Sequence, residues 1–235
     1  MGRSKRCLTV LRAALLSVFV ARQAPAQTAL TITVPDSGSI GADFYGSGER
    51  GLLLVGHGGY STRATWAPQA RMLADSGFRV LVMETRAAVA LRDGNETECL
   101  YSASCMALDI LAAVRHMRLT GVKSVAVIGG SAGGGAAAEA SLRGKQGEID
   151  RLVLLAAMTI DAPQKIAGRK LFITAHNDLG SDGKPRLPGI RAQYDRAPEP
   201  KKFIVLEGSA HGQRMFDAPE GAQLMREIIR FLRAP

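Results

Sequence analysis

Uninterrupted apolar runs of three or four residues recur along most of the chain. They occupy residues 52–55, 80–83, 125–128, 152–155, 171–173 and 203–206. Runs without polar alternation are typical of strands buried on both faces, as in a parallel sheet. Ahead of them, residues 29–34 alternate between apolar and polar types. Residues 42–45 can pair with that segment as an antiparallel hairpin, because Pro35, Gly38 and Gly41 punctuate the intervening turn.

Helical patterns fill most of the intervals between these runs. They predict helices near residues 66–74, 106–117, 132–142 and 224–232, and a short helix near residues 190–194. Thr65 is the expected N-cap and Gly77 the expected end of the first helix, whereas Asp217, Pro219 and Glu220 are expected to cap the last one. The alternation predicts an α/β fold, a three-layer α/β/α sandwich whose mostly parallel sheet begins with antiparallel strands.

The length and composition of the chain suit one globular domain. The 235 residues are 46% apolar and 22% charged, which is enough apolar material to bury a core. This composition excludes a disordered, collagenous or coiled-coil protein. We therefore expect a single domain over residues 27–235.

Residues 1–26 read as a secretory signal peptide. They combine basic residues, an apolar stretch over residues 13–21 and the sequence Ala24-Pro25-Ala26, which fits a cleavage site. The apolar stretch is too short to span a bilayer, which needs about 20 residues. This segment contains five basic residues and no acidic residue. Without it, the net charge of the chain falls from +9 to +4. We expect an exported protein, periplasmic or extracellular, with no stable membrane span and no nucleic-acid partner.

Export changes the interpretation of the cysteines. Cys99 and Cys105 are the pair left in the mature chain, and in an oxidising compartment they are expected to form a disulfide, with two separate buried thiols as the alternative. Neither His nor Cys occurs at metal-ligand spacing, so we expect no metal site.

The most informative segment is the glycine-rich turn after the apolar run of residues 125–128. Residues 129–133 read G-x-S-x-G with Ser131 at the centre, between a predicted strand and a predicted helix. Such a turn strains the central residue and exposes its hydroxyl at the carboxyl edge of the sheet. A phosphate-binding loop is the alternative, but its dinucleotide pattern normally lies in the first strand–turn–helix unit. Ser131 is therefore the candidate nucleophile.

Three segments in this order resemble the α/β-hydrolase fold family, in particular its small lid-less members of the dienelactone-hydrolase-like and carboxylesterase-like kinds. They are the apolar strand that ends in His57-Gly58, the turn around Ser131, and Gly208-Ser209-Ala210-His211-Gly212 after the last strand. Dienelactone hydrolases themselves use Cys as the nucleophile, so their lactone substrate does not carry over to a chain with Ser131.

The resemblance implies a catalytic base and an acid after the nucleophile. His211 lies in the loop where the family keeps its base, and His176 is the main alternative; His57 matches a structural position and His116 a solvated helix face. Asp178 follows a strand and fits the acid loop of the family.

Asp161 and Asp182 remain alternatives for the acid. For the oxyanion hole, the amide of Ala132 should supply one donor, and the resemblance points to the amide of Gly59 for the other.

These residues together imply a serine hydrolase that cleaves a carboxylic ester or related acyl compound, from a small molecule or a polymer end, without a cofactor. The alternatives are amide or peptide hydrolysis or acyl transfer by the same residues, and a binding protein that has kept the fold without activity. The sequence carries no signal for the oligomeric state.

Overall fold

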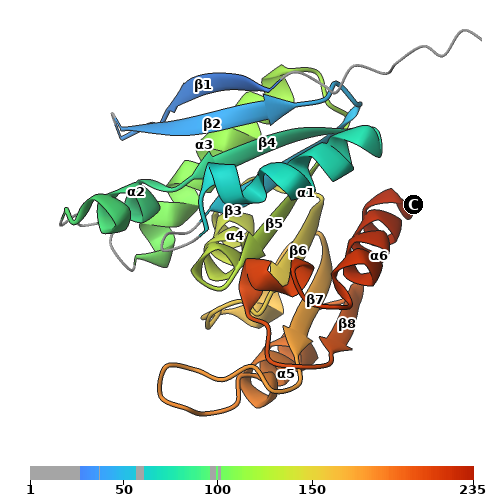
Figure 1. Cartoon of the computed structure of the whole chain (residues 1–235). Coiled ribbons are helices and arrows are strands. Elements are labelled where there is room, and N and C mark those ends of the chain that lie inside the picture. The colour runs from blue at the N-terminus through green and yellow to red at the C-terminus, as the bar shows by residue number, and fades with distance from the viewer. Residues whose placement is uncertain (1–26, 37, 57–60, 96–98, 100–101) are drawn as a thin grey trace, which may run out of the picture.

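The apolar runs form the strands of one twisted sheet, shown in Figure 1. The computed structural model describes residues 27–36, 38–56, 61–95, 99 and 102–235. Within these residues the sheet has eight strands in the order β1-β2-β4-β3-β5-β6-β7-β8. Their bounds are β1 (Thr28–Thr33), β2 (Ser39–Tyr45), β3 (Arg50–Gly56), β4 (Phe78–Glu84), β5 (Ser124–Gly130), β6 (Arg151–Leu155), β7 (Arg169–Ala175) and β8 (Lys201–Leu206).

The sheet is antiparallel at its start and parallel afterwards, which confirms the predicted fold class. β1 pairs with β2 and β2 with β4 in antiparallel register, and every other neighbouring pair is parallel. The second strand of the hairpin begins at Ser39, three residues before the predicted start, because Ser39 to Gly41 pair with Thr31 to Thr33. The central strands are buried on both faces, and residues 52–55 have no solvent exposure at all.

Helices cover both faces of the sheet. In Figure 1, α1 and α6 lie on one side and α3 and α4 on the other, while α5 contacts β7. The bounds of the helices are α1 (Arg63–Asp75), α2 (Arg86–Asp93), α3 (Ala103–Leu119), α4 (Ala132–Arg143), α5 (Leu187–Arg196) and α6 (Gly221–Arg233), with 3₁₀ turns η1 (Pro163–Lys165) and η2 (Gly212–Phe216). The sequence pattern predicted all of the α-helices except α2, whose eight residues are too few for a clear periodicity.

The ends of two helices differ from the prediction. Thr62, not Thr65, caps α1: its hydroxyl accepts from the amide of Thr65, and the Thr65 hydroxyl accepts from the amide of Thr62. This reciprocal pair is a capping box in which Thr65 takes the place usual for Glu or Gln, and it moves the start of the helix to Arg63. At α6 the N-cap residue is Glu220, whose side chain makes no capping hydrogen bond. Asp217, expected from the sequence to help cap this helix, is the C-cap of η2 instead.

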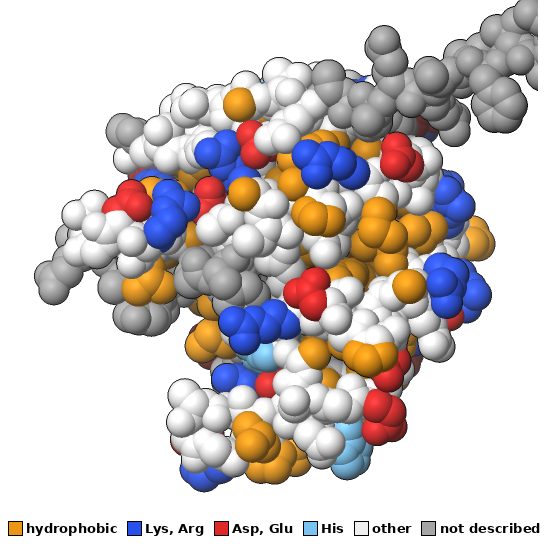
Figure 2. Space-filling view, viewed as in Figure 1, with side chains coloured by type: hydrophobic (Ala, Val, Ile, Leu, Met, Phe, Trp, Pro, Cys, Tyr) orange, Lys and Arg blue, Asp and Glu red, His pale blue; other side chains and the backbone are white. Residues whose placement is uncertain are grey.

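The predicted signal peptide, residues 1–26, lies outside the described residues. None of the helices in the described part of the chain combines the length and apolarity needed to cross a bilayer. On the face shown in Figure 2, the side chains of Lys and Arg are interspersed with those of Asp and Glu.

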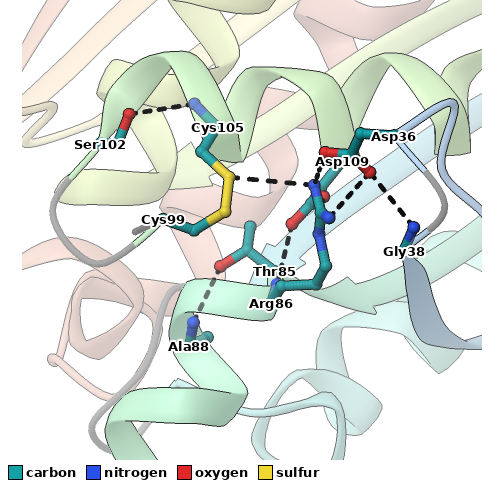
Figure 3. The surroundings of a disulfide bond; sticks show 9 residues. All are labelled: Asp36, Gly38, Thr85, Arg86, Ala88, Cys99, Ser102, Cys105 and Asp109. Carbon is teal, nitrogen blue, oxygen red and sulfur yellow. Dashed lines mark hydrogen bonds and ion pairs between the residues drawn. A yellow bond between two sulfur atoms is a disulfide. The ribbon is translucent and has the colours of Figure 1, made fainter. Parts of the chain in front are cut away.

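Arg86 links three parts of the chain beside the disulfide through ion pairs with Asp36 and Asp109 (Figure 3). Cys99 and Cys105 are joined with their Cα atoms 5.1 Å apart, and Arg86 Nη2 lies 3.8 Å from Cys105 Sγ. Arg86 donates from its amide (2.8 Å) and its Nε (2.7 Å) to the fully buried carboxylate of Asp109, and from both Nη atoms to Asp36 (2.8 Å). Burial raises the pKa of Asp109 although Arg86 opposes the shift.

This arrangement predicts unequal costs for removing the two acidic partners of Arg86. Asp109→Ala should destabilise the protein by about 3 kcal/mol, because it leaves a partly buried guanidinium without its buried partner. Asp36→Ala removes an exposed partner and should cost much less. Urea unfolding of both variants measures the difference; equal midpoints would show that burial of the pair does not matter.

Candidate active site

Ser131 sits in a strained turn between β5 and α4. Its backbone has φ +52° and ψ −120°, a region that residues other than glycine rarely adopt. The amide of Ser131 donates to the carbonyl of Leu155 (2.9 Å), and its own carbonyl accepts from the amides of Gly134 (3.1 Å) and Met158 (2.9 Å). The strand β6 and the segment after it therefore hold the strained residue on both sides.

Two glycines let this turn close. A Cβ at Gly129 would lie 2.4 Å from the carbonyl oxygen of Gly133, and a Cβ at Gly134 would lie 2.9 Å from Cβ of Ala157. Both distances are shorter than side chains tolerate, and the first involves backbone that cannot move aside. The first glycine of G-x-S-x-G, and Gly134 directly after the motif, thus have a direct steric cause.

The structure brings Asp178 and His211 together. Asp178 follows β7 and its side chain is 2% exposed; its Oδ2 lies 2.7 Å from Nδ1 of His211, which is 25% exposed. The carboxylate can therefore hold the imidazole in one orientation and stabilise its protonated form. Of the three predicted acids, Asp178 is therefore the one that the structure places beside His211.

The alternative residues lie elsewhere. Asp161 and Asp182 are exposed, and the amide and ammonium of Lys184 hold the pKa of Asp182 below its usual value. His176 is exposed and contacts Asn177 (3.1 Å). His116, expected on a solvated face, is half-buried, with its ring 6.2 Å from that of Phe44.

The loop that carries His211 passes directly against the serine turn. A Cβ placed on Gly130, the residue before Ser131, would lie 3.2 Å from both Gly212 Cα and the Gln213 amide nitrogen. The residue after His211 and the residue before Ser131 are therefore in backbone contact, so the histidine loop and the nucleophile candidate share one edge of the sheet.

One of the two predicted oxyanion donors can be placed. Ala132 is the first residue of α4, so its amide is among the first four N–H groups, which have no partner within the helix. The positive end of the helix dipole also favours negative charge at this point. Gly59, the other predicted donor, and His57 lie outside the described residues.

Gln213 and Phe216, for which no sequence pattern indicates a role, support this site. The hydroxyl oxygen of Thr65 in α1 lies within hydrogen-bond distance of Oε1 of the buried Gln213 (3.2 Å), and the rings of Trp66 and Phe216 pack edge to face at 5.8 Å. These contacts fix the histidine loop to the start of α1. The two residues of each contact are separated by about 150 residues of chain, so no local sequence pattern could reveal the contact.

Arg186 is the second neighbour of the acid. Its Nε lies 3.7 Å from Oδ1 of Asp178 and donates to the carbonyl of Leu179 (3.2 Å), while its amide donates to the carbonyl of Asp178 (2.9 Å). Among the described residues, no three His, Cys, Asp or Glu side chains cluster as a metal site would need.

Comparison with known proteins identifies the family of the chain. The sequence of residues 51–174 matches the family described as alpha/beta hydrolase fold. The chain belongs to the alpha/beta hydrolase fold family. This confirms the resemblance read from the sequence. No curated protein sequence shows significant similarity to the chain.

Solved structures of this hydrolase fold superpose over most of the chain. A dienelactone hydrolase from Anabaena variabilis has a TM-score of 0.68 at 18% identity, covering 88% of this chain and 97% of its own. An esterase from Pyrococcus furiosus has a TM-score of 0.69 at 17% identity, covering 89% and 92%. A predicted CIB-like hydrolase from Thermoplasma acidophilum has a TM-score of 0.68 at 18% identity, covering 89% and 99%. At such low identities the likeness is one of fold.

The steric account of the turn predicts opposite outcomes for two glycines of this alpha/beta hydrolase. Gly129→Ala should destabilise it by about 3 kcal/mol, because the new Cβ meets the backbone of Gly133. At Gly135 a Cβ meets Cβ of Met158 at an ordinary 3.5 Å, so Gly135→Ala should be neutral or stabilise α4 by up to about 1 kcal/mol. Thermal unfolding tests the pair, and a Gly129→Ala protein as stable as Gly135→Ala would contradict it.

Proposed function

We propose that the protein is a serine hydrolase that cleaves a carboxylic ester or related acyl compound through an acyl-enzyme. The observation that carries the proposal is the 2.7 Å contact between Asp178 and His211 on a loop packed against the strained turn of Ser131. Membership of the alpha/beta hydrolase fold family supports it, because this fold presents its nucleophile on such a turn.

The reaction begins with attack of Ser131 Oγ on the carbonyl carbon of the substrate. His211 accepts the hydroxyl proton at Nε2, and the buried carboxylate of Asp178 stabilises the imidazolium that forms. The imidazolium then returns the proton to the leaving alkoxide, which leaves an acyl group on Ser131. A water molecule, deprotonated by the same histidine, attacks this acyl group and restores the free hydroxyl.

The negative charge that develops on the carbonyl oxygen needs donors in place before the reaction. The amide of Ala132 supplies one at the start of α4, and the amide of Gly59 is assigned as the second. Each such donor contributes about 3 kcal/mol of transition-state stabilisation in this type of site. No cofactor takes part in the scheme, and the substrate is a small molecule or the end of a polymer.

The central test is covalent labelling with a fluorophosphonate probe, which reacts with activated serines. The wild-type protein should be labelled and should hydrolyse aryl esters, whereas Ser131→Ala should lose the label. Its turnover should fall by about 10⁴-fold or more, because the nucleophile is removed. Asp178→Asn should keep some labelling but react much more slowly.

The matched control is Ser181→Ala, an exposed serine in the loop that carries Asp178. It should be labelled like the wild type. The proposal would be wrong if the folded wild-type protein neither reacted with the probe nor hydrolysed esters or aminoacyl anilides. That outcome would favour a binding role for the fold. Faster turnover of the anilides would instead assign the same residues to amide hydrolysis.

We also propose that the protein is exported and acts in the periplasm or outside the cell. The basic, apolar and small-residue segments of residues 1–26 support this, as does the disulfide between Cys99 and Cys105. Expression of the full chain in a secreting bacterial host should yield a mature protein that begins near Gln27, as N-terminal sequencing can show. Recovery of the uncut chain from the cytoplasm would contradict the proposal.

A further inference from the structure

A pocket of about 210 Å³ lies between the segment after β6 and the start of α5. It adjoins the candidate site on two sides. Met158, on one wall, donates its amide to the carbonyl of Ser131 (2.9 Å), and Arg186, on the other wall, lies 3.7 Å from the carboxylate of Asp178. Figure 1 shows α5 beside the end of β7, the strand that leads to Asp178.

The polar side chains that line this pocket, those of Arg186, Gln193 and Thr159, each offer at least one hydrogen-bond donor. The side chain of Arg186 donates only from its Nε within the described chain, so the four N–H groups on its Nη atoms are available. Gln193 uses its oxygen to accept from the amide of Ile160 (2.8 Å), and its NH₂ group donates to no acceptor among the described residues. Thr159 and Gly189 also line the pocket, and neither the Thr159 hydroxyl nor the Gly189 amide, in the first turn of α5, donates to an acceptor among the described residues.

Neither Asp178 nor Asp182 accepts a hydrogen bond from the Nη atoms of Arg186 or from the other donors of the pocket. Asp178 is already held by His211 at 2.7 Å, and its 3.7 Å separation from Arg186 is longer than a hydrogen bond. Asp182 pairs with Lys184 (3.3 Å) at the exposed tip of the loop. None of the residues that line the pocket is acidic. The pocket is thus lined by one guanidinium and several neutral hydrogen-bond donors, and no negatively charged side chain lines it.

We propose that this pocket binds a free carboxylate on the substrate, so that the preferred substrates are esters that carry a second, unesterified carboxyl group. A carboxylate matches the single cation and its planar guanidinium, which can bind both oxygens. A phosphate dianion would meet only one positive charge there. The apolar side chains of Met158, Pro185 and Ile190 would contact the methylene groups that lead to the carboxylate.

This inference rests on the proposed hydrolase function, because it places the carboxylate beside the residues assigned to catalysis. Hydrolysis of the 4-methylumbelliferyl half-esters of glutaric and adipic acid tests it against the valerate and hexanoate esters of equal chain length. Spontaneous hydrolysis is subtracted with the Ser131→Ala protein. The wild type should prefer the half-esters through a lower KM.

Arg186→Gln should reduce this preference about tenfold or more, which is the usual worth of a charged hydrogen bond. The ratio of kcat/KM for the charged and neutral esters is the decisive number, since it cancels any effect of Arg186 on Asp178 that does not depend on the bound carboxylate. The control is Lys184→Gln, a cation of the same loop that does not line the pocket. An unchanged ratio in Arg186→Gln, or an equal fall in Lys184→Gln, would overturn the inference.

A binding measurement separates failure of this inference from failure of the proposed function, because it needs no turnover. Glutarate should bind the Ser131→Ala protein in calorimetric titrations at constant ionic strength, and valerate should bind more weakly. Adding Arg186→Gln should weaken glutarate binding tenfold or more. Gly189→Phe should block binding by filling the pocket; a Cβ at this position meets no other atom within 4 Å, so the backbone can accept the larger side chain. Glutarate binding that is insensitive to both changes would refute the pocket as the site, whatever the activity.

Discussion

The strained backbone of Ser131 depends on the strand beside it. A residue with φ +52° is unfavourable by itself, and it persists here because the amide and the carbonyl of Ser131 are both bound by the strand β6 and the segment after it. That segment is strained as well, since Ala156 has φ +47° and donates its amide to Ile173 in β7 (2.7 Å). The parallel order of β5, β6 and β7 therefore holds the turn, and the position of the serine is a property of the sheet rather than of the loop alone.

The same sheet explains why distant residues meet at one edge. Ser131, Asp178 and His211 follow β5, β7 and β8 respectively, and parallel strands end at the same edge. Sequence order alone does not bring Asp178 within 2.7 Å of His211, 33 residues away. The loop of His211 also needs the buried Gln213 and the ring of Phe216, which anchor it to α1.

Much of this fold could be predicted because its strongest signals are local. Runs such as residues 52–55 lack polar positions because both of their faces are buried, and the serine turn is marked by glycines that a Cβ would break. The cap of α1 was harder to assign, because Thr62 and Thr65 each bind the amide of the other and either could begin the helix. Gln213 and Arg186 had no sequence signal, since an isolated polar residue acquires its role only from partners that folding brings to it.

The charge of Arg186 links the acid of the candidate site, Asp178, to the neighbouring pocket. Its guanidinium faces the carboxylate of Asp178 on one side and the pocket of donors on the other. A positive charge there opposes formation of the imidazolium at His211, because it competes for the same carboxylate. A substrate carboxylate bound in the pocket would draw that charge away from Asp178 and leave the aspartate free to stabilise the imidazolium. Binding of the charged end of a substrate and proton transfer at its scissile end would then be coupled through a single side chain, although the two ends never touch.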